Sequence, residues 1–198
     1  MSSKANGRAR FAGDVKLLVF ALLLILPTFA CHDRAKSTLT KTRSEIGAEI
    51  TRLLQQHRYD EAVNLGLSGL TGESEDAVLY RSIAVVYTVR AQNDSKNSER
   101  WLQSAVGFVD KSLEARPGDP LNTAAVAEAL EAIGDLSDGR KCQLYTRAES
   151  LWHLAATQPL DNSKVTTGGQ AISNAPIKPA AEPEILRIAS KRKANNCP

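Results

Sequence analysis

Aromatic residues are scarce in this chain. They make up 5% of its 198 residues, although hydrophobic residues of all kinds make up 42%. Ala and Leu dominate the apolar positions, and β-branched residues rarely stand in runs. Such a composition favours helices, and no segment shows the strict alternation of apolar and polar residues that is typical of a strand. We therefore expect an all-α protein with a core of small and aliphatic side chains.

Signatures of catalysis are also lacking. The sequence contains no Gly-x-Ser-x-Gly elbow, no phosphate-binding loop and no dinucleotide fingerprint. The three histidines, His32, His57 and His153, stand far apart, and none belongs to a set of Cys, His or carboxylate residues at metal-ligand spacing. An active site needs titratable groups that converge, and we find none. We therefore expect no catalytic residue, no cofactor and no metal ion, and predict that the chain is not an enzyme.

The chain has no strongly basic folded region. Its formal net charge is +3, but residues 31–157 hold 15 basic and 18 acidic side chains. Residues 158–198 hold six basic and three acidic side chains. Because a nucleic-acid-binding domain presents a basic surface to phosphates, we expect no nucleic-acid partner.

One long hydrophobic run is present, close to the N-terminus. Leu17 to Leu26 form an unbroken apolar stretch, preceded by a basic segment and followed by Pro27 and small residues. This is the layout of a secretory signal. From Leu17 to Cys31 the apolar region has 15 residues, whereas a membrane-spanning helix needs about 20. Cleavage is therefore favoured over a permanent span.

The residues that follow the run bear on where the protein resides. Thr28-Phe29-Ala30-Cys31 resembles a bacterial lipobox. This resemblance implies that Cys31 is the lipid attachment site and becomes the new N-terminus after cleavage. The apolar run also allows an uncleaved anchor, or ordinary cleavage with release. We predict that residues 1–31 are a signal peptide or membrane anchor, and that the protein is membrane-anchored in the cell envelope on the extracytoplasmic side.

Residues 32–43 are predicted to be a polar spacer, and residues 44–157 a helical domain. Within that domain apolar residues recur at the spacing of one helix face. Pro117-Gly118 ends one helix, and Asp119-Pro120 begins the next as its N-cap and first residue. Six helices are expected, at about 44–57, 59–70, 74–91, 98–115, 120–133 and 138–157.

The predicted helices form pairs with a regular spacing. The second, fourth and sixth begin near Tyr59, Ser98 and Asp138, about 40 residues apart, which is typical of paired-helix arrays. The stretches 58–62 (RYDEA), 111–120 (KSLEARPGDP) and 134–136 (GDL) followed by Ala148 resemble the tetratricopeptide repeat family and its bacterial lipoprotein relatives. The resemblance covers about residues 44–157. It implies three stacked helical hairpins with a concave face that grips a protein or peptide. A compact six-helix bundle has the same periodicity and remains the alternative.

Two large aromatic residues, Trp101 and Trp152, are the candidate partner-binding residues, because aromatic side chains anchor protein interfaces. The alternative is that both fill gaps between helices. The expected function is a membrane-tethered scaffold that binds another protein or peptide, with the membrane contacted through the N-terminus. An accessory or assembly subunit of a membrane complex, and a compact bundle carrying a small ligand, are the alternatives.

The last 41 residues, 158–198, contain five of the eight prolines and are predicted to be a disordered tail. Within them, residues 184–193 (EILRIASKRK) are either a solvated segment or a short helix that docks on a partner or on anionic lipid. Cys142 and Cys197 either pair, which would fix the tail to the body, or stay unpaired. Sequence alone does not decide the pairing, and we favour unpaired thiols.

Overall fold

Helices make up most of the chain that the computed structural model describes, namely residues 41–159, 166–167, 170–171 and 177–198. They are α2 (Arg43–Gln55), α3 (Tyr59–Ser68), α4 (Asp76–Asn93), α5 (Ser98–Ala115), α6 (Pro120–Leu136), α7 (Lys141–Thr157) and α8 (Lys178–Ala194). Two-residue strands β1 (Thr166–Thr167) and β2 (Gln170–Ala171) pair antiparallel. The expected all-α fold is confirmed.

Local sequence signals account for several helix ends. Asp119 caps α6, because its carboxylate accepts hydrogen bonds from the backbone N–H groups of Leu121 and Asn122 at 2.9 and 3.1 Å. Gly118 precedes this cap with a φ of +73°, a conformation that favours glycine. Thr42 and Glu45 form a capping box at the start of α2.

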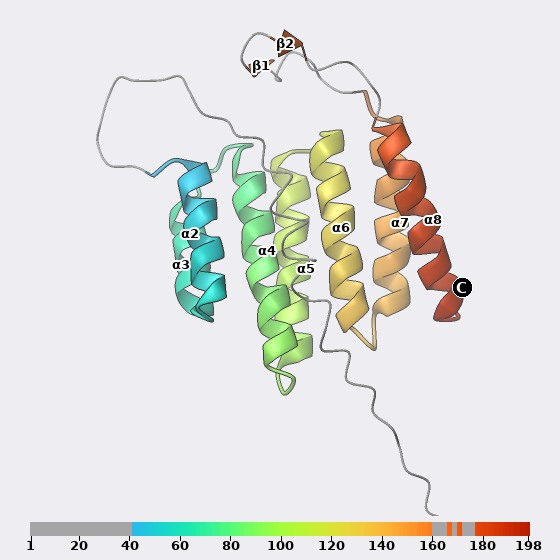
Figure 1. Cartoon of the computed structure of the whole chain (residues 1–198), viewed down its shortest axis with the longest axis horizontal. Helices are drawn as coiled ribbons and strands as arrows, with labels where there is room; N and C mark the ends of the chain where they lie inside the picture. The colour runs from blue at the N-terminus through green and yellow to red at the C-terminus, as the bar shows by residue number, and fades with distance from the viewer. Residues whose placement is uncertain (1–40, 160–165, 168–169, 172–176) are drawn as a thin grey trace, which may run out of the picture. The chain divides into compact units, whose positions relative to one another are not determined.

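The helices are arranged as a row of hairpins. The pairs α2–α3, α4–α5 and α6–α7 each pack together, and successive pairs meet through α3 with α4 and through α5 with α6. In addition, α4 packs against both α2 and α6. Figure 1 shows α2 and α3 at one end of the row and α8 at the other. This arrangement is compatible with the predicted stacking of three helical hairpins.

The buried side chains form two apolar clusters. The first joins α2, α3 and α4 and includes Ile50, Val63 and Ile83. The second extends from α4 to α8 and includes Leu102, Leu130 and Trp152. Tyr87 and Phe108 of the middle hairpin pack against both clusters. The middle hairpin therefore links the two halves of the core.

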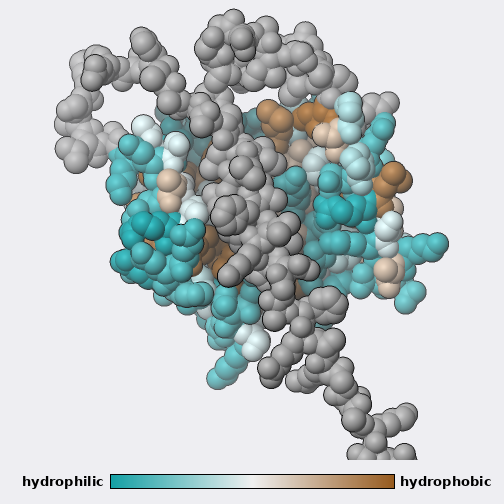
Figure 2. Space-filling model, in the orientation of Figure 1, coloured by the Kyte–Doolittle hydropathy of each residue, from teal (hydrophilic) through white to brown (hydrophobic). Residues whose placement is uncertain are grey.

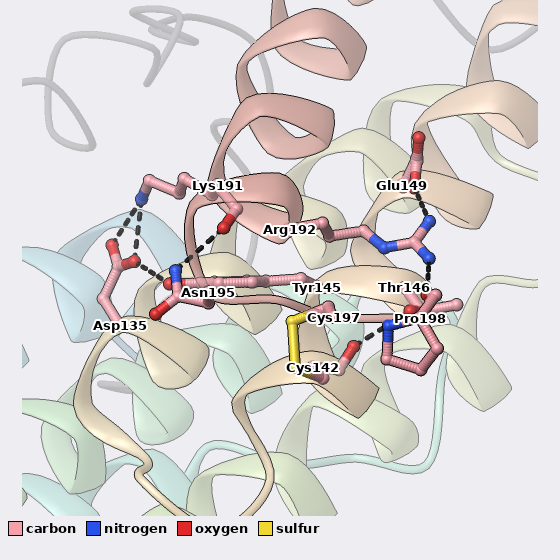
Figure 3. The surroundings of a disulfide bond; sticks show 10 residues. All are labelled: Asp135, Cys142, Tyr145, Thr146, Glu149, Lys191, Arg192, Asn195, Cys197 and Pro198. Carbon is pink, nitrogen blue, oxygen red and sulfur yellow. Dashed lines mark hydrogen bonds and ion pairs between the residues drawn. A yellow bond between two sulfur atoms is a disulfide. The ribbon is translucent and has the colours of Figure 1, made fainter.

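The C-terminal segment is the main departure from the sequence prediction. Residues 178–194 form helix α8, which packs on α7, and Ala181 and Ile188 are fully buried. Cys142, in the first turn of α7, forms a disulfide with Cys197 (Figure 3). The prediction that residues 158–198 form a disordered tail is therefore wrong for residues 177–198, and the prediction of unpaired thiols is wrong. As an isolated helix this segment would have little stability in water, and its contacts with the rest of the chain stabilise it.

The predicted signal or anchor at 1–31, the lipid attachment site Cys31 and most of the spacer at 32–43 lie outside the described residues. Among the helices that are described, none is both long and apolar enough to cross a membrane.

Candidate interaction surface

Trp152 is a core residue. Its side chain is 4% exposed and belongs to the apolar cluster that extends from α4 to α8. A buried indole is not available to a partner, so the prediction that Trp152 binds a partner is corrected here. Trp152 instead fills the space between helices, which was the alternative interpretation.

Trp101 lies in a different setting, in the first turn of α5, and is half-buried. Its indole N–H donates a hydrogen bond to the Asp94 carboxylate at 2.9 Å. Asp94 follows α4 directly and also accepts hydrogen bonds from the Asn97 side chain. These hydrogen bonds hold the pKa of Asp94 below its ordinary value. The α4–α5 turn therefore fixes the orientation of the Trp101 ring.

The Trp101 ring is one of four in a continuous row along the middle hairpin. Trp101 stacks on Tyr87, with ring centroids 6.0 Å apart, and Tyr87 stacks on Phe108 at 5.6 Å. Phe108 then contacts Tyr80 at 6.3 Å. We call Tyr80, Tyr87, Trp101 and Phe108 the aromatic row. Each of them is half-buried, so each has one part in the core and another part at the surface.

Sequence spacing explains why these rings align. Tyr80 and Tyr87 are seven residues apart on α4, and Trp101 and Phe108 are seven apart on α5. Seven residues are two helical turns, so each pair lies on one face of its helix. The two helices pack together in a hairpin, which interleaves the two pairs. The spacing was visible in the sequence, but the interleaving required the packing of the helices.

Cationic side chains flank the aromatic row. The Arg90 guanidinium lies over the Trp101 ring, 3.9 Å from its centroid, and Arg100 lies 5.1 Å away. At Phe108, the Lys111 ammonium lies 4.9 Å from the ring centroid. Attraction between a cation and the face of a ring stabilises such contacts. Arg100 and Lys111 are exposed, so both present positive charge to solvent beside the rings.

Arg90 also connects the row to the first hairpin. It forms an ion pair with Asp60 of α3 at 2.5 Å, and its guanidinium lies 6.0 Å from the Tyr59 ring. The Tyr59 hydroxyl is in turn 2.8 Å from Nδ1 of His57. The surface therefore continues from the middle hairpin onto the start of α3.

Hydrophilic residues cover much of the described surface in the view of Figure 2, and hydrophobic residues form small patches near the upper ends of α6 and α7. Leu121 near the start of α6 and Leu154 near the end of α7 are 56% and 45% exposed. Isolated exposed leucines are common on soluble surfaces. They do not combine with charged or aromatic groups as the aromatic row does.

Groups suited to chemistry do not converge in the part of the chain that the structure describes. No set of three or more His, Cys, Asp or Glu residues there is placed to hold a metal ion. His57 and His153 are both exposed and lie on different hairpins. A hollow of about 420 Å³ lies against α2, lined by Lys41, Glu45, Ala48, Glu49 and Arg52. Its lining comes from one helix and the residues before it, so it is an open surface.

Comparison of the chain with protein-family models, with curated proteins and with solved structures gives no match.

Proposed function

We propose that this chain is a membrane-tethered scaffold in the cell envelope, which binds another protein or peptide through the surface of its helical hairpins. The aromatic row is the observation that carries this proposal. Half-buried Trp and Tyr rings next to arginine form the kind of surface that supplies most of the binding energy at protein interfaces. The rings are held in place before binding, which lowers the entropy cost of association.

The row of hairpins supports the same function. Each hairpin packs mainly on its neighbours, and stacked helical pairs offer an extended surface instead of a closed pocket. On this surface the aromatic row lies at the middle hairpin, with the first hairpin next to it through Arg90 and Asp60. A partner that contacts the row is thus expected to contact at least two hairpins.

The disulfide supports a location outside the cytoplasm. Disulfides such as Cys142–Cys197 persist in oxidising compartments, which include the bacterial periplasm. Together with the secretory layout of residues 1–31, this favours an exported protein. The lipobox resemblance supports Cys31 as the tether.

The test is partner capture by the full chain from membrane extracts, with two variants. In Arg100→Glu/Lys111→Glu both exposed cations beside the aromatic row are reversed, and capture should fall about tenfold or more because the local potential changes sign. The matched control is Lys193→Glu, an exposed residue on α8. It should capture as wild type does. All three proteins should share one melting midpoint, and equal capture by all of them would contradict the proposal.

A further inference from the structure

Helix α8 is held on the rest of the chain at several points. It packs against α7, and the Cys142–Cys197 disulfide joins the start of α7 to the residues after α8. The two helices therefore run antiparallel, and Figure 1 shows them side by side. Ala181 and Ile188 of α8 are fully buried in the cluster that contains Leu130, Tyr145 and Ala148. Ile177, Ile185 and Cys197 are partly buried and pack against the same cluster.

Charge provides much of the remaining contact. Arg187 and Lys191 of α8 both pair with the Glu131 carboxylate of α6, the latter at 2.8 Å. Lys191 also pairs with Asp135 at 2.7 Å. Arg192 pairs with Glu149 of α7 at 2.6 Å. Figure 3 shows the Asp135 and Glu149 pairs on either side of the disulfide. Every one of these pairs has its cation on α8.

We call the surface that receives α8 the α8-docking face, defined by Glu131, Asp135, Tyr145, Ala148 and Glu149. It combines three carboxylates from two helices with apolar side chains of the core. The Tyr145 hydroxyl donates a hydrogen bond to Asp135 at 2.6 Å, and the Lys191 ammonium lies 5.8 Å from the Tyr145 ring. Such a face fits a helix with apolar residues on one stripe and basic residues beside it.

Glu131 shows that this face requires a cationic occupant. Its side chain is 3% exposed, and Oε1 accepts from the two α8 cations, whereas Oε2 has no hydrogen-bond partner within the described residues. A buried carboxylate without a counter-charge is strongly unfavourable. Any segment that covers Glu131 in place of α8 must therefore bring a counter-charge, which selects a basic segment.

The linker between α7 and α8 is long enough for α8 to leave the α8-docking face while it stays attached to the chain. Twenty residues, 158–177, separate the end of α7 from the start of α8. Antiparallel helices are usually joined by about 2–8 residues. Twenty residues span up to about 65 Å when extended, which is far more than an antiparallel pair needs. The disulfide is thus the second covalent constraint that keeps α8 on this face.

We propose that the α8-docking face is a second protein-binding site, which takes a basic amphipathic helix from a partner once the Cys142–Cys197 disulfide is open and α8 detaches. In the oxidised chain α8 occupies the site. Opening requires a dithiol reductant. One of its thiolates attacks a cysteine sulfur, its second thiol closes a new disulfide, and Cys142 and Cys197 each leave as a thiol. This inference does not rest on the aromatic row.

The first test is hydrogen exchange on the unmodified full chain, before and after reduction by a dithiol. Reduction should lower the amide protection of residues 178–194 by about tenfold or more, because those amides then exchange through local opening. Helices α2 to α5 should keep their protection. Unchanged protection of α8 after reduction would overturn the proposal.

The second test measures binding of a labelled peptide of residues 177–196, which lacks cysteine, to three full chains. Oxidised wild type should not bind it. Cys142→Ser/Cys197→Ser should bind weakly, because the tethered α8 competes at high effective concentration. Adding Arg187→Glu/Lys191→Glu to that chain should strengthen binding about tenfold or more, because the tethered competitor loses its cations.

The control is the same peptide carrying Arg187→Glu and Lys191→Glu, which should bind none of the three chains. Equal binding of both peptides, or equal binding of the unmodified peptide to all three chains, would contradict a charge-selective site. Circular dichroism melting shows whether the fourfold variant remains folded. If it does not, the decision rests on the hydrogen exchange of the unmodified chain.

Discussion

At the residue scale, a small polar network joins the middle hairpin to the third. The Ser112 hydroxyl donates to the carbonyl of Ala77 at 3.0 Å, and the Asn122 side-chain amide donates to the carbonyl of Ser112 at 2.9 Å. Arg81 donates to the Asn122 side-chain oxygen. Burial, with a contribution from the nearby charge of Arg116, lowers the pKa of Arg81 to about 10. Arg81 is therefore still charged at neutral pH and needs its acceptor.

This network gives the first prediction. Asn122→Ala removes the acceptor of Arg81 and the donor to Ser112, and Asn122 is only 2% exposed. Because buried polar groups are then left without partners, the free energy of unfolding measured in urea should be about 1–3 kcal/mol lower than for wild type. The matched control is Asn64→Ala on α3, an exposed position, which should change stability by less than about 0.5 kcal/mol. Equal effects at the two sites would contradict the role of the network.

The second prediction concerns Glu128 of α6. Burial, and next the Glu184 carboxylate, raise the pKa of Glu128 above its ordinary value, although Arg187 acts in the opposite direction. A raised pKa means that the charged form is disfavoured in the folded state. At pH 7 Glu128 is therefore destabilising, and this penalty fades as pH falls through the raised pKa and is absent below the ordinary glutamate pKa of about 4.3.

Glu128→Gln should accordingly raise the melting midpoint at pH 7 and leave it unchanged near pH 3. The free energy of unfolding at pH 7 should rise by about 0.5–1 kcal/mol, since solvent screens a partly exposed group. The exposed Glu114 of α5 provides the control, because Glu114→Gln should show no such pH-dependent gain. A loss of stability at pH 7 in Glu128→Gln would show that the carboxylate is stabilising.

The candidate site could be predicted only in part from the sequence. Trp101 and Trp152 were equivalent as large aromatic residues on amphipathic helices, yet one is half-buried at the surface and the other is in the core. The difference arises from tertiary packing, because Trp152 is enclosed in the cluster that extends from α4 to α8, whereas Trp101 only packs against that cluster and bonds to Asp94 of the α4–α5 turn. The seven-residue spacings within the aromatic row were present in the sequence, but the contacts between helices were not.

At the element scale, helices α2 to α7 were predictable because each has a strong local pattern of apolar residues and clear end signals. The N-cap Asp119 is correct. Helix α4, by contrast, begins at Asp76 without a side-chain cap. The carboxylate of Asp76 instead accepts the backbone N–H groups of Thr71 and Gly72 at 2.8 and 2.7 Å. That contact stabilises the preceding turn.

Helix α8 could not be predicted with the same reasoning. Its apolar stripe is short, and it contains Pro179 and Pro183, which suggested disorder. Pro179 lies in the first turn, where its missing N–H would have no partner within the helix, whereas Pro183 lies inside the helix and removes one backbone hydrogen bond. Contacts with residues more than 40 positions away, including Glu131, Glu149 and Cys142, hold the helix in place. Sequence periodicity carries no information about such partners.

The packing of α3 on α4 gives the third prediction. A Cβ at Gly66 would lie 2.6 Å from Cγ1 of Ile83, a fully buried side chain. Gly66→Ala should therefore lower the free energy of unfolding by about 1–3 kcal/mol through overpacking. Gly47 in α2 has no atom within 4 Å of such a Cβ, so Gly47→Ala should stabilise by about 0.5–1 kcal/mol because Ala favours helix. Urea denaturation measures both changes, and a shared sign would contradict the close approach of α3 and α4.

At the scale of the whole molecule, charge is distributed so that the C-terminal segment complements the body. Residues 31–157 carry an excess of three acidic side chains and residues 158–198 an excess of three basic ones. In the structure Arg187, Lys191 and Arg192 lie against acidic residues of α6 and α7. The small net charge of the chain thus includes an acidic body and a basic C-terminal segment, which pair within one molecule.

The fourth prediction tests the membrane tether. If Cys31 is the lipidated N-terminus, labelled palmitate should enter wild type, whereas Cys31→Ser should lose the label and accumulate as unprocessed precursor. Gel fluorography of membrane fractions shows both changes. Cys142→Ser is the control, since it alters another cysteine and should keep the label. Label that persists in Cys31→Ser would rule out attachment at this residue.

Photo-crosslinking in intact cells shows whether a partner protein contacts the aromatic row. A photoreactive amino acid replaces Arg100 or Lys111, beside the row, or Arg52, an exposed residue of α2. Positions 100 and 111 should give adducts heavier than the chain, and these adducts should be lost when Trp101→Ala is added to a chain that still melts cooperatively. Adducts from position 52 alone, or no difference among the three positions, would contradict contact of a partner with the aromatic row.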